Sequence, residues 1–202
     1  TNIKSYLIMN GWFSHTPETC LPISPNIIPI FWGFHISNYN NGWDYFSQNK
    51  TIDYFKKYEP IGCRDPYTAY RLSKLGVHTF VSKCLTLTLP IRKEKPKDNL
   101  IIIVDGDKVS QPNTLPINKD KVFLPEYIKE EALIFTHRMS PWMTENATRI
   151  YASHLLHVYE KASLIITTRL HCLLPCIAMG IPVIFIGDSN DSRVPWVSEL
   201  GI

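Results

Sequence analysis

Short apolar runs alternate with amphipathic stretches along the chain. An apolar run of about four to eight residues between polar or turn residues is typical of a strand, whereas apolar residues about three or four apart are typical of a helix. These patterns predict strands at Ser5–Met9, Asn26–Phe34, Glu59–Cys63, Thr79–Leu89, Leu100–Val104, Ala132–Phe135, Ser163–Thr167 and Ile181–Ile186. They predict helices at Tyr45–Tyr58, Pro66–Leu75, Asn146–Lys161 and Leu170–Met179.

The alternation of strands and helices favours a doubly wound α/β fold. Right-handed crossovers through helices give a mostly parallel sheet with helices on both faces. Such sheets bind ligands beyond the carboxyl ends of their strands. The stretch Pro90–Asn99 combines prolines with charged residues and has no apolar periodicity, so we interpret it as a linker between two domains.

Net charge, apolar stretches and cysteine number exclude several classes of protein and of partner. A net charge of +3 is too small for a nucleic-acid-binding surface, which needs clustered Lys and Arg. The longest apolar stretch, Cys172–Ile186, is interrupted by proline and glycine and is too short to span a membrane. The five cysteines are odd in number and have no metal-site or disulfide spacing, so we expect reduced thiols, a cytoplasmic protein and no bound metal.

The strongest chemical signal lies where the strand Ser163–Thr167 runs into a helix. Arg169 and His171 fall at the carboxyl edge of this strand, beside the positive end of the following helix. A guanidinium and free backbone N–H groups there are suited to hold an anion, and an imidazole titrates near neutral pH. The alternative is a histidine that only caps or packs a loop.

Two blocks of the chain resemble the polysaccharide pyruvyl transferase family. The run TTRLHCLLPCIAMGIPVIFI, residues 167–186, is similar to the family's carboxyl-terminal signature of a strand, Arg-Leu-His, an apolar helix and a Gly-Ile-Pro turn. The second block, residues 60–89, places PIGCRD before a helix and KCLTLTL after it. The resemblance implies a GT-B-like architecture of two Rossmann-like domains. Residues 1–90 would form the acceptor-side domain, and residues 91–202 the domain with the donor-binding motif.

The resemblance also implies a reaction. A pyruvyl group would move from phosphoenolpyruvate to two hydroxyls of a sugar, forming a pyruvate ketal, with no cofactor beyond the donor substrate itself. Arg169 and Leu170, and also Arg64, would bind the donor by their place in the motifs. His171 would be the general acid that protonates the enol carbon.

Other residues lie in or directly after predicted strands, and each has two interpretations. His137 and Arg138 lie on the same edge as Arg169 and would contact the donor, or else be solvated surface residues. His35 and Trp32 would bind the sugar acceptor, since aromatic rings stack on sugars, or else belong to the core. Asp65 would cap the helix Pro66–Leu75, with Arg64 paired to a carboxylate instead of a donor.

Two other functions share this fold, because a fold does not determine a function. A GT-B glycosyltransferase with a nucleotide-sugar donor would need a carboxylate for the ribose, for which Asp188 or Glu145 is available. A non-catalytic saccharide-binding relative would use Arg169 and His171 only for packing.

Overall fold

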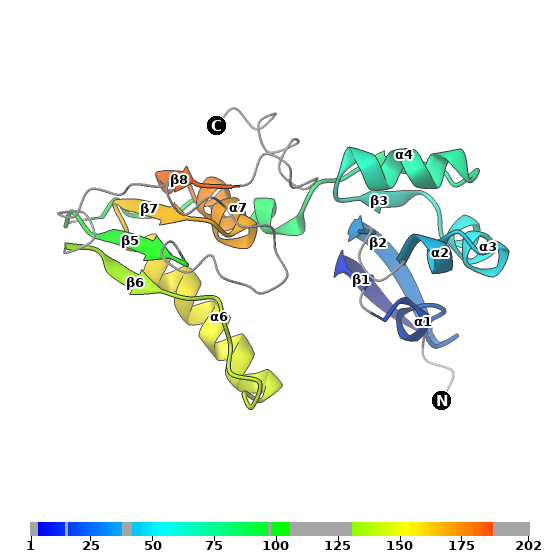
Figure 1. The fold of residues 1–202 in the computed structure, drawn as a ribbon, viewed down its shortest axis with the longest axis horizontal. Helices are drawn as coiled ribbons and strands as arrows, with labels where there is room; N and C mark the ends of the chain where they lie inside the picture. Colours follow the sequence, from blue (N-terminus) through cyan, green and yellow to red (C-terminus); the bar gives the residue numbers. More distant parts are fainter. Residues whose placement is uncertain (1–3, 15, 38–41, 97, 106–130, 188–202) are drawn as a thin grey trace. The chain divides into compact units, whose positions relative to one another are not determined.

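The computed structural model describes residues 4–14, 16–37, 42–96, 98–105 and 131–187, and they form two compact units. Among the described residues, the first unit ends at Leu85 and the second begins at Thr86. Each unit contains a four-stranded sheet in which every strand pair is parallel (Figure 1). The prediction of mixed α/β structure with parallel sheets is confirmed for both units.

The first unit has the strand order β1-β2-β3-β4, which is also the order along the chain. Its strands are β1 (Ser5–Trp12), β2 (Ile27–His35), β3 (Ile61–Cys63) and β4 (Thr79–Val81). Its described helices are α1 (Pro17–Cys20), α2 (Gly42–Phe46), α3 (Asn49–Lys57) and α4 (Pro66–Lys74), and the 3-10 helix η2 (Leu85–Thr88) follows.

Aromatic side chains form the centre of the first core. Phe34 of β2 is fully buried, and its ring contacts those of Phe31, Phe46 and Phe55 at centroid distances of 5.2, 5.8 and 5.6 Å. These contacts are all edge-on, the arrangement that the ring quadrupoles favour. The core therefore joins β2 to α2 and α3, and it fixes the face of the sheet on which these helices lie.

The opposite face of the first sheet carries exposed apolar side chains. Tyr6 and Ile8 of β1 are 72% and 54% exposed, and Ile30 and Trp32 of β2 are 43% and 38% exposed. The expectation that helices cover both faces is therefore wrong for the described part of this unit. The sequence could not reveal this, because Ile30 and Trp32 are as apolar as the buried residues beside them.

The second unit has the strand order β6-β5-β7-β8. Its strands are β5 (Ile101–Val104), β6 (Leu133–Phe135), β7 (Leu164–Thr167) and β8 (Val183–Phe185), and its described helices are α6 (Glu145–Glu160) and α7 (Leu170–Ala178). Both helices bury side chains in one core with residues of the central strands β5 and β7. Val104 is in register with both Phe135 and Thr167, so these three strands end at one edge.

Two predicted elements differ from the structure by more than a shift of a few residues at an end. The strand predicted at Thr79–Leu89 ends at Val81, because Lys83 has a positive φ of 60° that extended backbone cannot accommodate. The helix predicted at Tyr45–Tyr58 is divided in two by Gln48, whose backbone is extended. The apolar spacing continues across this break because both short helices bury residues in the same core.

The N-cap predicted at Asp65 is confirmed at the start of α4. The carboxylate of Asp65 accepts a hydrogen bond from the Thr68 N–H at 2.8 Å, as an N-cap does. Gly76 has a φ of 80°, a conformation that glycine adopts without steric cost at the end of a helix.

Candidate functional site

Three segments meet at the carboxyl edge of the second sheet. Asp105 follows β5, Thr136 to Arg138 follow β6, and Thr168 to His171 follow β7. Because β5 pairs with both β6 and β7 in parallel, the three segments leave the sheet side by side. The predicted donor-binding residues of the second unit therefore gather around Asp105.

Asp105 is the residue that connects these segments. Its Oδ1 accepts from the Thr136 hydroxyl at 2.5 Å, and its Oδ2 accepts from the His137 N–H at 3.1 Å and from Arg169 Nε at 2.7 Å. Burial alone would raise the pKa of this carboxyl, but these hydrogen bonds and the charge of Arg169 outweigh burial and hold the pKa below its ordinary value. Asp105 is therefore a buried carboxylate that stays ionised at neutral pH.

Arg169 has one side of its guanidinium bound and the other side available. Nε of Arg169 is bound to Asp105. Among the described residues, it is the only nitrogen of this guanidinium that has a partner. The side chain is 32% exposed, whereas that of Asp105 is 5% exposed. The two terminal amino groups are therefore left to bind a carboxylate or a phosphate, which match the planar fork of a guanidinium.

The backbone of Arg169 begins α7. Its carbonyl accepts from the N–H groups of Cys172 and Leu173, and no side chain caps this helix. The N–H groups of Leu170 and His171 lie in the first turn, where the helix has no internal acceptor for them. The positive end of the helix thus adds to the guanidinium in attracting an anion.

His171 and Leu170 differ in what they offer a ligand. The side chain of His171 is exposed in the first turn of α7, on the same edge as Arg169. Leu170 is 7% exposed, so its side chain belongs to the core, and the predicted donor contact could be made only by its backbone. The structure therefore brings Arg169 and His171 together at the sheet edge, as their spacing predicted.

His137 and Arg138 are at the same edge but point differently. Nε2 of His137 lies 2.6 Å from the Tyr159 hydroxyl of α6, and the two rings stack. The imidazole thus faces α6, and its backbone N–H binds Asp105. Arg138 is exposed, and its N–H donates to the Thr136 hydroxyl. Of these two predicted donor-binding side chains, the structure leaves Arg138 at the surface and holds His137 against Tyr159.

Two predicted site residues of the first unit, His35 and Arg64, are buried at the ends of β2 and β3. His35 and Asp65 are 3% and 2% exposed, and Nδ1 of His35 lies 2.5 Å from Oδ2 of Asp65. The hydroxyl of Thr68 donates to the same oxygen at 2.9 Å. Arg64 is 3% exposed. The capping role of Asp65 is confirmed, and His35 contacts Asp65 and Thr68 inside the fold.

This buried pair predicts a stability effect. We expect Asp65→Asn to lower the free energy of unfolding by about 3 kcal/mol, because breaking a buried ion pair leaves one partner uncompensated. Asparagine caps helices as well as aspartate does, so the loss reports the contact with His35 rather than the cap. Urea unfolding at neutral pH measures it, with Asp53→Asn on the exposed side of α3 as the matched control. Equal stability of the two variants would contradict the prediction.

The same pair gives stability a dependence on pH. Burial would raise the pKa of Asp65, but the hydrogen bonds from His35 and Thr68 and the charge of His35 lower it below the ordinary value. The stabilisation is therefore present above the unfolded carboxyl pKa of about 4 and is lost as pH falls through the lower folded pKa. The difference in the free energy of unfolding between wild type and Asp65→Asn should therefore shrink in acid. A difference that widens in acid would refute the assignment.

Trp32 lies on the exposed face of the first sheet. Its ring meets Phe80 of β4 edge-on at a centroid distance of 5.6 Å and is 38% exposed. Gly62 of β3 lies between them in the sheet, and a Cβ there would come within 3.0 Å of the Phe80 ring. The absence of a side chain at Gly62 thus allows the two rings to meet, and Trp32 retains a surface on which a sugar could stack.

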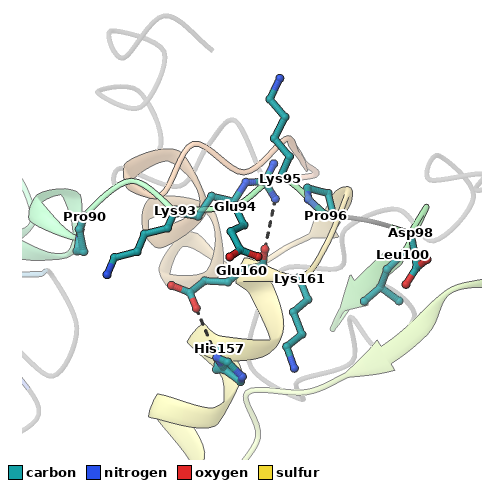
Figure 2. A pocket seen from close by; sticks show the side chains of 11 residues that line it. Pro90, Lys93, Glu94, Lys95, Pro96, Asp98, Leu100, His157, Glu160 and Lys161 are labelled. Carbon is teal, nitrogen blue, oxygen red and sulfur yellow. Dashed lines mark hydrogen bonds and ion pairs between the residues drawn. The ribbon is translucent and has the colours of Figure 1, made fainter.

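A pocket of about 660 Å³ opens at the other, amino-terminal edge of the second sheet (Figure 2). The Arg92 guanidinium donates to the Ala162 carbonyl at 2.7 Å, just past the end of α6, so this arginine satisfies the end of a helix. The side chains of Lys93, Lys95 and Lys161 extend in different directions (Figure 2). None of the predicted site residues lines this pocket, so we place the candidate site at the opposite edge.

Comparison with protein families identifies the family of this chain. A family model for polysaccharide pyruvyl transferase matches residues 3–190. The chain belongs to the polysaccharide pyruvyl transferase family. Comparisons with curated proteins and with solved structures gave no match.

Membership makes this polysaccharide pyruvyl transferase a transferase enzyme, and the family implies a sugar or glycan acceptor. Within the described ranges, no helix is both long enough and apolar enough to cross a membrane. In the same ranges, no three His, Cys, Asp or Glu side chains gather so that they could hold a metal ion.

Sequence reasoning did not single out Asp105, which the structure places at the centre of the candidate site of this pyruvyl transferase. One signal was present, because a polar residue directly after a buried parallel strand lies on the ligand-binding edge. Tyr159 was missed as well, since an aromatic residue in an amphipathic helix is indistinguishable from an ordinary core residue. Neither contact is visible before the strands are paired.

Proposed function

We propose that this enzyme transfers a pyruvyl group from phosphoenolpyruvate to two hydroxyls of a glycan and forms a pyruvate ketal. One observation carries the proposal: the guanidinium of Arg169 is held through Nε by Asp105 while its terminal amino groups remain available at the start of α7. Phosphoenolpyruvate carries a carboxylate and a phosphate, and both are suited to a guanidinium fork beside a helix N-terminus. No further cofactor is part of the proposal.

The reaction requires one proton transfer to carbon and one loss of phosphate. The methylene carbon of the donor gains a proton and becomes a methyl group, which leaves positive charge at the neighbouring carbon. One sugar hydroxyl adds to that carbon, the bond to phosphate breaks, and the second hydroxyl closes the ketal. The two hydroxyl protons balance the proton given to carbon and the one that leaves with phosphate.

His171 is the residue that we assign to protonate the donor. It lies two positions after Arg169, in the first turn of α7, and its side chain is exposed on the edge where the donor would bind. Asp105 is unsuited to this role, because its carboxyl has three hydrogen-bond donors and a pKa below the ordinary value. A general acid must hold its proton near the working pH, as an imidazole does.

The acceptor side of the proposal rests on the first unit. We assign residues 1–90 to an acceptor-side domain and residues 91–202 to a donor-side domain in a GT-B-like architecture. The exposed ring of Trp32 supports a sugar contact. His35 and Arg64 are buried in the described structure, so their proposed contacts with acceptor and donor would require these side chains to become accessible.

A nucleotide-sugar donor would need a carboxylate that can bind a ribose. Asp105 accepts bonds from three protein groups and has little remaining capacity. Glu145 pairs with Arg149 on the exposed first turn of α6. Asp188 lies outside the described residues. These contacts favour phosphoenolpyruvate as the donor.

Thermal unfolding with each donor tests the proposal directly. We expect phosphoenolpyruvate to stabilise the enzyme, by about 2.7 kcal/mol at a hundredfold excess over Kd, and nucleotide sugars to leave it unchanged. Phosphate release from phosphoenolpyruvate should then depend on an added oligosaccharide, which assays across a panel would identify. Stabilisation by a nucleotide sugar alone would overturn the proposal.

A further inference from the structure

We propose that Asp105 is a positioning residue of the donor site, which fixes the guanidinium of Arg169 so that its terminal amino groups face the donor. This inference rests on the proposed function in that the anion is taken to be phosphoenolpyruvate. Asp105 itself touches no reacting atom in the proposal. It acts through Arg169.

The hydrogen bonds of Asp105 show how the position of Arg169 is set. The side chain binds Arg169 Nε, and the backbone carbonyl of Asp105 accepts from the Thr168 hydroxyl at 3.1 Å. The Arg169 N–H donates to the Thr167 hydroxyl at 3.0 Å. Both the guanidinium and the backbone of this arginine are thus attached to the ends of β5 and β7. An arginine side chain is otherwise flexible, and fixing it in advance reduces the entropy lost on binding.

The other oxygen of Asp105 is fixed from the opposite side. Thr136 binds Oδ1, and the Thr136 carbonyl accepts from the Tyr151 hydroxyl of α6 at 2.8 Å. His137 binds Oδ2 through its N–H and is itself held by Tyr159 of the same helix. The carboxylate therefore cannot rotate without breaking contacts that lead to α6. This is how a supporting residue keeps a ligand-binding side chain in place.

The backbone of Asp105 has a conformation that the fold must maintain. Its φ is 53°, in the left-handed region that non-glycine residues rarely adopt. Aspartate and asparagine tolerate this region better than other residues, so asparagine can replace Asp105 without added backbone strain. Such outliers cluster at functional sites, where surrounding contacts hold them. Asp105→Asn is therefore a suitable probe of the carboxylate charge.

The sign of the effect on donor binding distinguishes positioning from simple electrostatics. Removal of a negative charge beside an anion site should tighten anion binding if the charge acts only by repulsion. If Asp105 positions Arg169, the same change should weaken binding. We expect the Kd for phosphoenolpyruvate to rise about 10- to 100-fold in Asp105→Asn, because a small displacement of a binding group can cause a loss of this size. Asp98→Asn, at the amino-terminal edge of the same sheet, is the matched control and should leave Kd unchanged.

A double-mutant cycle with Arg169→Ala tests whether Asp105 acts through Arg169. The four proteins are titrated with phosphoenolpyruvate by calorimetry, and residual phosphate release gives kcat/KM. In the Arg169→Ala background, Asp105→Asn should cause no further loss of binding or kcat/KM, because the group that it positions is gone. Additive losses, unchanged binding or tighter binding in Asp105→Asn would each overturn the proposal.

A second variant covers the case in which Asp105→Asn does not fold. Thr136→Val removes one hydrogen bond from the carboxylate and leaves its charge in place. We expect the Kd for phosphoenolpyruvate to rise about three- to tenfold, which corresponds to the free energy of one lost hydrogen bond. In the Arg169→Ala background we again expect no effect. An unchanged Kd in folded Thr136→Val would count against the role.

The cycle also separates this inference from the proposed donor. The same proteins are titrated with a nucleotide sugar. If wild type binds only the nucleotide sugar, the proposed function fails, yet a non-additive loss for that anion would still support positioning by Asp105. If wild type binds phosphoenolpyruvate and the losses are additive, the function stands and the positioning role fails.

Discussion

Replacement of Arg169 by alanine is expected to lower kcat/KM for phosphoenolpyruvate about a thousandfold. The structure leaves two terminal amino groups for the donor. A hydrogen bond to a charged group contributes about 2 kcal/mol, so loss of two is about 4 kcal/mol, and about 1.4 kcal/mol corresponds to a factor of ten. Steady-state phosphate release at varied donor concentration measures the change.

The control for this variant is Arg149→Ala, which removes an arginine from the exposed surface of α6. It should keep full activity, since a surface ion pair contributes little. Arg169→Lys adds a sharper comparison, because lysine keeps the positive charge but has no planar fork and no Nε to bind Asp105. We expect Arg169→Lys to recover only a small part of the lost activity. Activity near the wild-type level in Arg169→Lys would mean that charge alone binds the donor.

Replacement of His171 by alanine is expected to lower kcat about 100- to 10,000-fold, the range found when a general acid is removed. The KM for phosphoenolpyruvate and its stabilising effect should change little, because Arg169 and the start of α7 remain. The side chain is exposed, so the fold should tolerate the change. Single-turnover phosphate release, together with thermal shift by the donor, separates the two steps.

His154→Ala is the matched control, because His154 is exposed on α6 and has no assigned role. It should behave as wild type in both measurements. Unchanged phosphate release in His171→Ala would remove His171 from the acid role and leave donor binding by Arg169 untouched. A loss of donor binding in His171→Ala, with kcat unchanged, would make His171 a binding group instead.

Much of the fold was predictable because its signals are local. The run Leu100–Val104 is β-branched and apolar, and β5 spans Ile101–Val104 within it. The helix after Asp65 begins where its N-cap predicted. Local signals failed at Gln48 and Lys83. The apolar pattern continues past both positions, whereas the backbone leaves the helical conformation at Gln48 and the extended conformation at Lys83.

The candidate site was predictable in part for the same reason. Arg169 and His171 were found because a strand, a turn and a helix start follow one another within one segment of the chain. Arg64 and His35 also follow strands, but the structure buries both. His35 is buried against Asp65 and Thr68, which lie 30 and 33 residues later in the chain, so the spacing of residues within one segment does not reveal its burial.

The sequence by itself determined the family, the order of the strands along the chain, and the segment that holds Arg169 and His171, because these depend on residues close together in the chain. Only the tertiary structure decided that Asp105, 64 residues before Arg169, is its partner. The physical reason is that pairing β5 with β7 in parallel brings two distant strand ends to one edge. The contacts that orient a binding side chain are made across that edge, after the sheet has formed.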